Sequence, residues 1–326
     1  MGKLSNIKLL GILGGLILIY VLFEVFGGKN RSDNFRSELV NYQNDKVDRI
    51  VITKEGKSME LRKNGSLWTL KTEKGIEVEA VASKVDNAIA MLKEAKPSRI
   101  AARKEEKWKD YNVDDSTGVR VEFFAESKKV ADVVLGRFAP TQRGGTFAFS
   151  SFVRLYDEKE VYICEDFMAM SFPNKSSDFR ETTLLKFNRD SIFEISFAFP
   201  ADSSFLIKKG DDGKWTIDGK EVNSDAFSNF LSDINYTMST DFEDGLSKTG
   251  LGKETYALIV KEKGTLEPIT ISAFPNPEKK WLITSSMNSN AIFSDSEEKI
   301  IKKMFSKGKK HFLPAETTAT NAKKSK

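Results

Sequence analysis

The sequence has very few of the residues on which most enzymes and metal sites depend. It contains one histidine, His311, and one cysteine, Cys164, among 326 residues. A zinc site needs several such ligands, a disulfide needs two cysteines, and a Ser-His-Asp triad needs a well-placed histidine. Cys164 lies in the alternating stretch VYIC, typical of a strand, and His311 lies in a lysine-rich segment near the C-terminus. We therefore expect no enzyme, no catalytic or metal-binding residue and no cofactor.

A strong excess of one charge is also absent. The 51 lysine and arginine residues are nearly balanced by 47 acidic residues, for a net charge of +4. Nucleic-acid-binding domains usually concentrate basic residues on one face, whereas here both signs are interspersed. Binding to nucleic acid is therefore not expected. The length and the 40% content of hydrophobic residues suffice for two domains with separate cores.

A long apolar run stands near the N-terminus, at residues 9–28, and Glu24 is its one charged residue. As a helix it would be about 30 Å long, the thickness of the hydrocarbon core of a bilayer. Its bulky end, FEVFGG, is a poor cleavage site, which favours an uncleaved anchor over a cleaved signal peptide. The run predicts a single-pass protein of a bacterial inner membrane, with residues 1–8 in the cytoplasm and the bulk in the periplasm.

Two features of this run bear on a partner helix. Gly11, Gly14 and Gly15 form a small-residue patch that would let a second helix approach closely. Glu24 has two interpretations: it reaches the lipid headgroups from its place near the end of the run, or it pairs with a partner helix inside the membrane. The sequence leaves both open.

After a polar linker at 29–45, the chain repeats one pattern twice. Alternating apolar and polar residues predict strands, and a helical apolar period predicts one helix per copy, at 79–96 and at 223–236. Trp215 falls in the second copy where Trp68 falls in the first. The strands predicted in the first copy are 47–53, 58–63, 67–71, 119–125, 129–136, 149–155 and 161–164. In the second copy, the stretches at 192–199 and 204–217 correspond to the first three of these strands.

This pattern predicts an α+β fold. We expect an N-terminal transmembrane helix and then two tandem duplicated modules of mainly antiparallel sheet, with one long helix each. The modules are placed at 46–175 and 176–307, and a disordered basic tail at 308–326 follows them.

Several short motifs resemble those of one bacterial family. They are LWTLK at 67–71, KWKDYNV at 107–113, FVRL at 152–155, VYIC at 161–164 and DFRETTLLKF at 178–187. Together they resemble the family known as domain of unknown function 4340. The loop at 111–113 reads Tyr-Asn-Val where the family has Tyr-Gly-Leu, and Thr-Gly-Leu at 249–251 is nearer. Phe179 stands where tryptophan is common.

The resemblance implies a membrane-tethered envelope protein without assigned catalytic residues. Related regions occur in auxiliary subunits of ABC-type transport systems, including systems linked to gliding motility. It therefore implies an accessory or scaffold subunit with integral-membrane partners, ABC-type transporter subunits among the candidates.

A different class of function rests on the loop GRFAPTQRGGTF at 136–147. Arg137, Arg143, Gly144 and Gly145 offer donors to a phosphate or a carboxylate, although the spacing is not that of a P-loop. A mobile hairpin loop is the simpler interpretation. The alternative to the scaffold is thus a periplasmic module that captures a glycan or another anionic ligand, and an envelope hydrolase is a third hypothesis.

Overall fold

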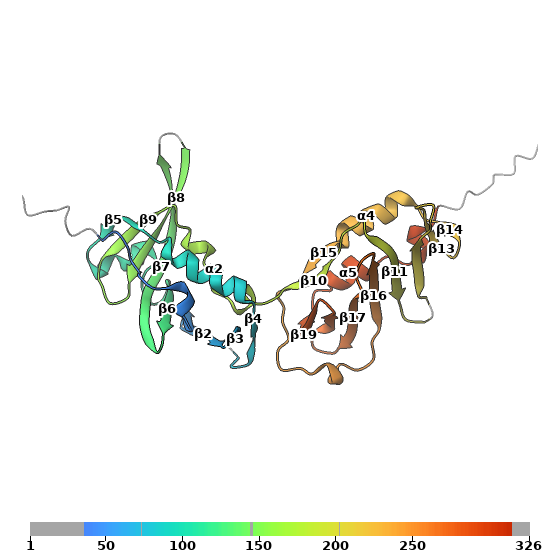
Figure 1. Cartoon of the computed structure of the whole chain (residues 1–326), viewed down its shortest axis with the longest axis horizontal. Coiled ribbons are helices and arrows are strands. Elements are labelled where there is room, and N and C mark those ends of the chain that lie inside the picture. The colour runs from blue at the N-terminus through green and yellow to red at the C-terminus, as the bar shows by residue number, and fades with distance from the viewer. Residues whose placement is uncertain (1–35, 73, 144–145, 202, 315–326) are drawn as a thin grey trace, which may run out of the picture. The chain divides into compact units, whose positions relative to one another are not determined.

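The computed structural model describes residues 36–72, 74–143, 146–201 and 203–314, with backbone alone at 141–143 and 146–147. This chain divides into two compact units (Figure 1). Described residues up to Lys175 form the first unit. Those from Ser176 onward form the second, which also includes Lys74–Ile76.

The first unit is built on a nine-stranded antiparallel sheet with the order β4-β3-β2-β1-β6-β7-β8-β9-β5. Helix α2 (Ala82–Lys93) lies on the sheet and buries one apolar face, as its 3.6-residue period requires. The strands are β1 (Arg49–Lys54), β2 (Lys57–Asn64), β3 (Leu67–Lys71), β4 (Glu77–Ala80), β5 (Pro97–Ala102), β6 (Val119–Ala125), β7 (Lys128–Arg143), β8 (Thr146–Leu155) and β9 (Val161–Glu165). The short helices are η2 (Asn44–Lys46), η3 (Glu105–Lys107), α3 (Trp108–Tyr111) and η4 (Ala169–Ser171).

The second unit has an eight-stranded antiparallel sheet with the order β14-β13-β12-β11-β16-β17-β18-β19, and a two-stranded sheet of β10 and β15. The strands are β10 (Thr183–Lys186), β11 (Ile192–Ala198), β12 (Phe205–Lys209), β13 (Trp215–Ile217), β14 (Lys220–Glu221), β15 (Tyr236–Met238), β16 (Tyr256–Glu262), β17 (Ile269–Asn276), β18 (Lys280–Ser285) and β19 (Asn288–Ser294). The helices are α4 (Ser224–Ile234), α5 (Lys299–Phe305), η5 (Ser176–Phe179), η6 (Lys248–Gly250) and η7 (Lys309–Phe312).

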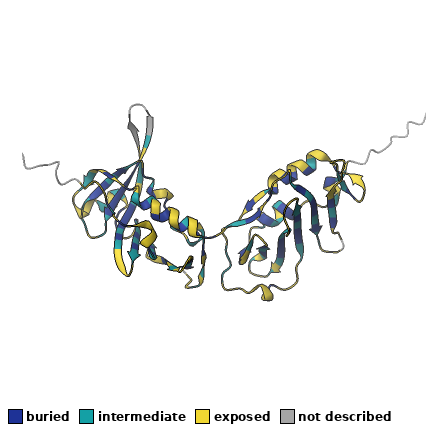
Figure 2. Ribbon diagram, viewed as in Figure 1, coloured by how far each residue is buried: buried dark blue, intermediate teal, exposed yellow. Residues whose placement is uncertain are grey.

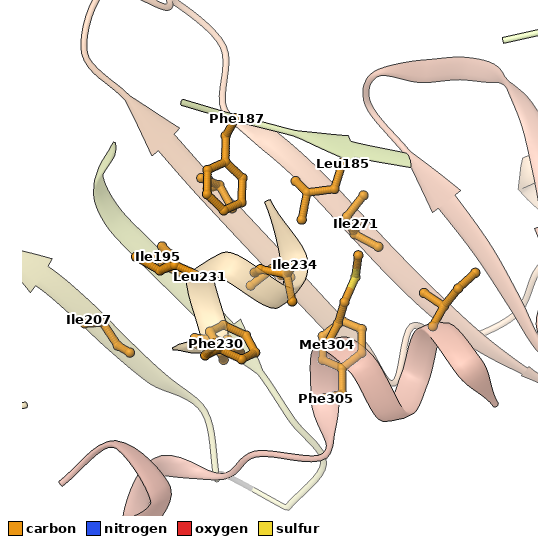
Figure 3. Close-up of a cluster of buried hydrophobic side chains, with 14 of the residues drawn as sticks. Leu185, Phe187, Ile195, Ile207, Phe230, Leu231, Ile234, Ile271, Met304 and Phe305 are labelled. Atoms are coloured by element: carbon orange, nitrogen blue, oxygen red, sulfur yellow. The ribbon is translucent and has the colours of Figure 1, made fainter. Parts of the chain in front are cut away.

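The core of the second unit lies between its helices and its sheet. Leu231 and Ile234 of α4 and Met304 of α5 meet Ile195 and Ile271 of the sheet (Figure 3). Figure 2 shows the buried residues along the strands and the exposed residues along the outer faces of the helices. Asn223 caps α4, because its side chain accepts a hydrogen bond from the N–H of Ala226.

The two large sheets have the same order of strands when β1 to β4 are matched with β11 to β14 and β6 to β9 with β16 to β19. The match extends to register. Lys63 stands opposite Trp68 across β2 and β3, and Lys209 stands opposite Trp215 across β12 and β13. The edge strand β5 has no named counterpart, and an isolated bridge to β19 takes its place in the order.

The segment before β1, which the sequence suggested as part of a linker, packs onto the first unit. Leu39 and Tyr42 are buried, and the Tyr42 hydroxyl donates to the carbonyl oxygen of Ile89 in α2 at 2.7 Å. Leu184 and Phe187 hold the corresponding places before β11 and are buried too. Each unit therefore begins with an apolar segment that covers its own helix and sheet.

The predicted fold class is wrong about the helices. The described α-helices are short, with 12 residues in α2, 4 in α3, 11 in α4 and 7 in α5, and neither unit has one long helix. The helix expected at 79–96 is shorter because its flanks belong to strands: Ala80 pairs with Trp68 in β3, and Pro97 begins β5. The fold is dominated by antiparallel sheet.

The predicted transmembrane helix and its topology also require a correction. In the part of the chain that the structure describes, no helix has the length and apolar character to cross a membrane. This finding contradicts the prediction of a single-pass inner-membrane protein with its bulk in the periplasm. The run at 9–28, with Gly11, Gly14, Gly15 and Glu24, lies outside the described residues, as does most of the predicted tail.

Candidate functional site at the base of a β-arm

Strands β7 and β8 form a hairpin that continues beyond the sheet. The pairing of β7 with β6 ends at Leu135, and the pairing of β8 with β9 ends at Ser150. Farther out, within the described residues, the two strands pair with each other, for example at Pro140 and Phe149, and the last contact from the β9 side is the hydrogen bond from the N–H of Asp166 to the Phe149 carbonyl oxygen at 2.8 Å. Figure 1 shows this hairpin projecting from the first unit. We call residues 138–149 the β-arm.

The β-arm exposes apolar side chains. Phe149 is 43% exposed, and its ring lies 5.7 Å from the ring of Phe138 across the two strands. Helix η4 lies beside the hairpin, and its Met170 is 64% exposed. Pro140 has no N–H to donate, which is typical of an edge strand. The arm thus combines exposed apolar groups with strand edges that have no strand partner among the described residues.

The base of the arm is a bulge at Gly136. The register of β7 and β8 shifts between Leu135 and Phe138, and such a bulge bends a hairpin away from its sheet. A Cβ on Gly136 would overlap the Tyr111 carbonyl oxygen and lie 2.5 Å from Val113 Cγ1. The loop at 108–118, called the base loop, is therefore packed directly against the start of the arm.

A buried arginine holds the base loop in place. The side chain of Arg154 in β8 is 1% exposed, and its guanidinium carbon lies 3.7 Å from the centre of the Trp108 ring. Its Nε donates to the carbonyl oxygen of Val113 at 3.0 Å, and its Nη1 donates to that of Tyr156 at 2.7 Å. Its Nη2 donates to the carboxylate of Asp115 at 3.3 Å. Each of the three guanidinium nitrogens thus donates a hydrogen bond, and the plane of the group lies against Trp108. We therefore assign Arg154 a structural role.

The base loop is also fixed from within by Asp114. Its carboxylate accepts hydrogen bonds from the N–H of Ser116 at 3.0 Å and from the hydroxyls of Ser116 and Thr117. Burial disfavours the ionised carboxylate, but these hydrogen bonds outweigh burial and lower the pKa of Asp114 to about 2. The carboxylate is therefore ionised at neutral pH and acts as a local cap.

The residues of the predicted ligand loop are not brought together as a site. Arg137 donates from Nε to the carbonyl oxygen of Asp110 at 2.8 Å, and its guanidinium carbon lies 4.9 Å from the centre of the Phe152 ring. It thus fastens the arm to the base loop. Gly144, Gly145 and the side chain of Arg143 lie outside the described residues. The loop itself is mostly strand, since β7 runs on to Arg143.

Sequence reasoning missed Arg154. The signal was present, because alternation in FVRL places Arg154 on the same side of its strand as Phe152. An arginine at such a position is buried only if the fold supplies acceptors. Those acceptors come from Val113 and Asp115, far away in the sequence, and a strand pattern contains no information about them.

The second unit has a loop in the corresponding place and also contains a buried arginine. Leu251, just after η6, is buried with Leu282 and Ile292, as Val113 of the base loop is buried with Val134 and Phe152. Arg180 donates two hydrogen bonds to the carboxylate of Asp244, at 2.9 and 2.8 Å. Each unit thus contains a buried arginine that is held by partners within the protein.

Comparison with known proteins gives one match. The family model described as domain of unknown function (DUF4340) matches residues 68–258, from the tryptophan strand β3 to strand β16. No curated protein and no solved structure matches the chain. The matched range includes the base loop, the β-arm and the segment that contains Arg180.

Proposed function

This chain belongs to the family described as domain of unknown function 4340, and from the geometry of its first unit we propose that it is a non-enzymatic accessory or scaffold subunit. It acts through protein contacts, and the β-arm is the element that makes them. The observation that carries this proposal is the arm itself, a two-stranded ribbon that continues past its sheet and exposes the ring of Phe149.

An isolated two-stranded ribbon gains little stability in water. Its unpaired N–H and C=O groups form a template for another strand, and exposed edges of this kind are usually shortened or covered. Phe149 adds apolar surface that binding would bury. A partner segment that adds a strand to the arm would supply both the missing hydrogen bonds and the apolar contact.

The base of the arm supports the same role. Gly136, Arg137 and Arg154 fix the hairpin to the base loop through close packing and hydrogen bonds. A fixed base sets the direction of the arm before binding, so less conformational freedom is lost when the partner docks. Such preorganisation is useful to a subunit whose task is to position another protein.

The buried charges favour a scaffold over an enzyme. Arg154, Arg180 and Asp132 each have partners within the protein that hold their side chains in place. Groups held in this way contribute to the fold, which is what we expect of a protein that acts through its surface.

The partner we propose is a protein that presents an extended segment to the arm. The family resemblance favours a subunit of an integral-membrane complex, such as an ABC-type transport or motility system. No ligand is needed for this interaction, and the alternative of anion capture at 136–147 gains no support from Arg137, whose Nε is bonded to the base loop.

Site-specific crosslinking tests the proposal. A photoreactive amino acid replaces Phe149 in one sample and Leu266, which is fully exposed in the second unit, in a matched control. A third sample carries no probe and has a shortened arm, in which Asn-Gly replaces residues 140–149. Ala139 and Ser150 are paired, so a two-residue turn closes the shortened hairpin without disturbing the sheet.

We expect the probe at position 149 to crosslink one partner, identified by mass spectrometry as a subunit of a membrane complex. The probe at 266 should not recover it, and the short-arm variant should fail to co-purify with it while keeping its unfolding temperature. Equal recovery from both positions, or crosslinks solely between copies of this chain, would refute the proposal.

A further inference from the structure

A groove in the second unit lies beside helix α4 and strands β12 and β13. Its volume is 690 Å³, which is within the range of about 300–1,000 Å³ that small-molecule sites occupy. The residues that matter here are Asn188, Arg189, Asp190, Lys209, Trp215 and Ser228, all of which line the groove. They combine one aromatic face with two cations, one carboxylate and neutral polar groups.

Arg189 is held in position by neutral groups. Its Nη1 donates to the hydroxyl oxygen of Ser232 and its Nη2 donates to that of Ser228, both at 2.8 Å. No carboxylate oxygen lies within 4.0 Å of its guanidinium among the described residues. Arg180 in the same unit shows the contrast, since Asp244 neutralises it through two hydrogen bonds. Arg189 is thus oriented, and its charge has no direct counter-ion.

The second cation of the groove is Lys209. Among the described residues, no carboxylate oxygen lies within 4.0 Å of its Nζ. Its Nζ lies 5.8 Å from the centre of the Trp215 ring. The first unit contains the equivalent pair, with Lys63 Nζ at 5.9 Å from the ring of Trp68. The comparison shows what differs: Trp68 is 2% exposed, whereas Trp215 is partly exposed and lines the groove.

The backbone next to the tryptophan is alike in the two units. In the first unit Ala80 of β4 pairs with Trp68. In the second unit β14 pairs with Thr216 and Ile217, and the N–H of Val222, just after β14, donates to the Trp215 carbonyl oxygen at 3.0 Å. The two units therefore differ in the exposure of the tryptophan side chain and in the cations beside it, and not in the pairing of its strand.

From this set of groups we propose that the groove binds an acidic saccharide, a sugar that carries a carboxylate or a phosphate. The partly exposed indole of Trp215 offers apolar ring surface for the C–H groups of a sugar ring. Arg189 and Lys209 pair with the anionic group, for which a guanidinium already oriented by two serines is well suited. The carboxylate of Asp190 accepts hydrogen bonds from ring hydroxyls, and the side-chain NH2 of Asn188 donates to them.

The single carboxylate of Asp190 argues against a bare dianion as the natural ligand. It reduces the net charge of the groove to +1, so inorganic phosphate alone gains less there than at a purely basic site. A sugar hydroxyl, in contrast, is a good donor to that carboxylate. The specificity therefore rests on the ring and the anionic group together.

Binding is tested on the full chain by isothermal titration with four probes: glucuronic acid, glucose 6-phosphate, glucose and inorganic phosphate. We expect saturable binding of at least one acidic sugar, and dissociation constants at least about tenfold higher for glucose and for phosphate. Which acidic sugar binds distinguishes a carboxylate from a phosphate ligand. Arg189→Gln and Lys209→Gln should each weaken binding about tenfold, the usual cost of losing one charged hydrogen bond.

Lys63→Gln is the matched control, because it removes the equivalent lysine of the first unit, where the tryptophan is covered. It should leave the affinity unchanged. The inference fails if neither acidic sugar binds below about 10 mM, if phosphate binds as tightly as glucose 6-phosphate, or if Lys63→Gln acts like Lys209→Gln. The short-arm variant should bind the sugar normally, so this test and the crosslinking test succeed or fail independently.

Discussion

Replacing Arg154 by methionine should destabilise the first unit and release the base of the β-arm. Methionine keeps much of the apolar length of the side chain but has no hydrogen-bond donor. The carbonyl oxygens of Val113 and Tyr156 would lose the donors that now lie at 3.0 and 2.7 Å. Val113 is fully buried, so water cannot easily replace its donor.

The size of the effect follows from these contacts. A buried acceptor left without a partner costs about 1–3 kcal/mol, and the loss of the stacked Trp108 contact adds about 1 kcal/mol. The carboxylate of Asp115 adds little, because its side chain is 71% exposed and regains water. We therefore expect Arg154→Met to lower the free energy of unfolding by about 3 kcal/mol.

The assay uses Cys164, which is the one cysteine of the chain and is buried in the first unit. Pulsed thiol labelling in increasing urea therefore reports unfolding of the first unit without interference from the second. Arg62→Met is the matched control, since Arg62 is 61% exposed and pairs with Glu60 at the surface. A loss below about 1 kcal/mol for Arg154→Met, or an equal loss for the control, would refute this reasoning.

The remaining predictions are tested by thiol labelling of Cys164 or by acid unfolding. Gly136→Ala should cost the first unit about 2 kcal/mol in the labelling assay, because its Cβ would overlap a carbonyl oxygen of the base loop. The lowered pKa of Asp114 predicts that its carboxylate contributes about 1–2 kcal/mol of stability above pH 4, which is lost as the pH falls toward 2. In acid-unfolding curves, Asp114→Asn should therefore reduce the dependence of the unfolding free energy on pH in this range. Burial raises the pKa of Cys164 to about 12, so thiol reagents at pH 8 should label the folded chain at least about 100-fold more slowly than the unfolded chain.

Strand patterns in the sequence located most of the sheet. The stretch at 47–53 alternates because one face of β1 is buried and the other is not, and that rule depends only on neighbouring residues. The turn before Trp215 is also a local feature: its Gly213 adopts a positive φ of 81°, which glycine reaches without strain. Features set by local geometry were therefore predictable.

The helix lengths were not predictable from the same patterns. The helix was expected to begin at residue 79, yet residues 79 and 80 belong to β4, where Ala80 pairs with Trp68. That pairing is a tertiary contact, and it overrides the weak preference of a short segment for one state. The apolar spacing at 297–305 does predict a helix, but the start of α5 is set by Asp295, which accepts the N–H groups of Ile300 and Ile301.

The candidate site shows the same division. The glycine and arginine residues at 136–147 suggested a ligand loop, but β7 continues through this region as a strand and Arg137 turns to the base loop. The groove at Trp215 was missed because both tryptophan strands look alike in the sequence. The side-chain exposure of Trp215 and the neighbouring Arg189, which α4 holds in place, are tertiary features that a strand pattern does not contain.

Hydrogen exchange of the β-arm tests the central claim most directly. Amides along residues 138–149 are measured by mass spectrometry on the full chain, alone and with the partner recovered by crosslinking. If a partner strand adds to the arm, these amides should exchange at least about tenfold more slowly in the complex, while those of β16 to β19 keep their rates. Unchanged exchange along the arm in a complex that has formed would contradict the account.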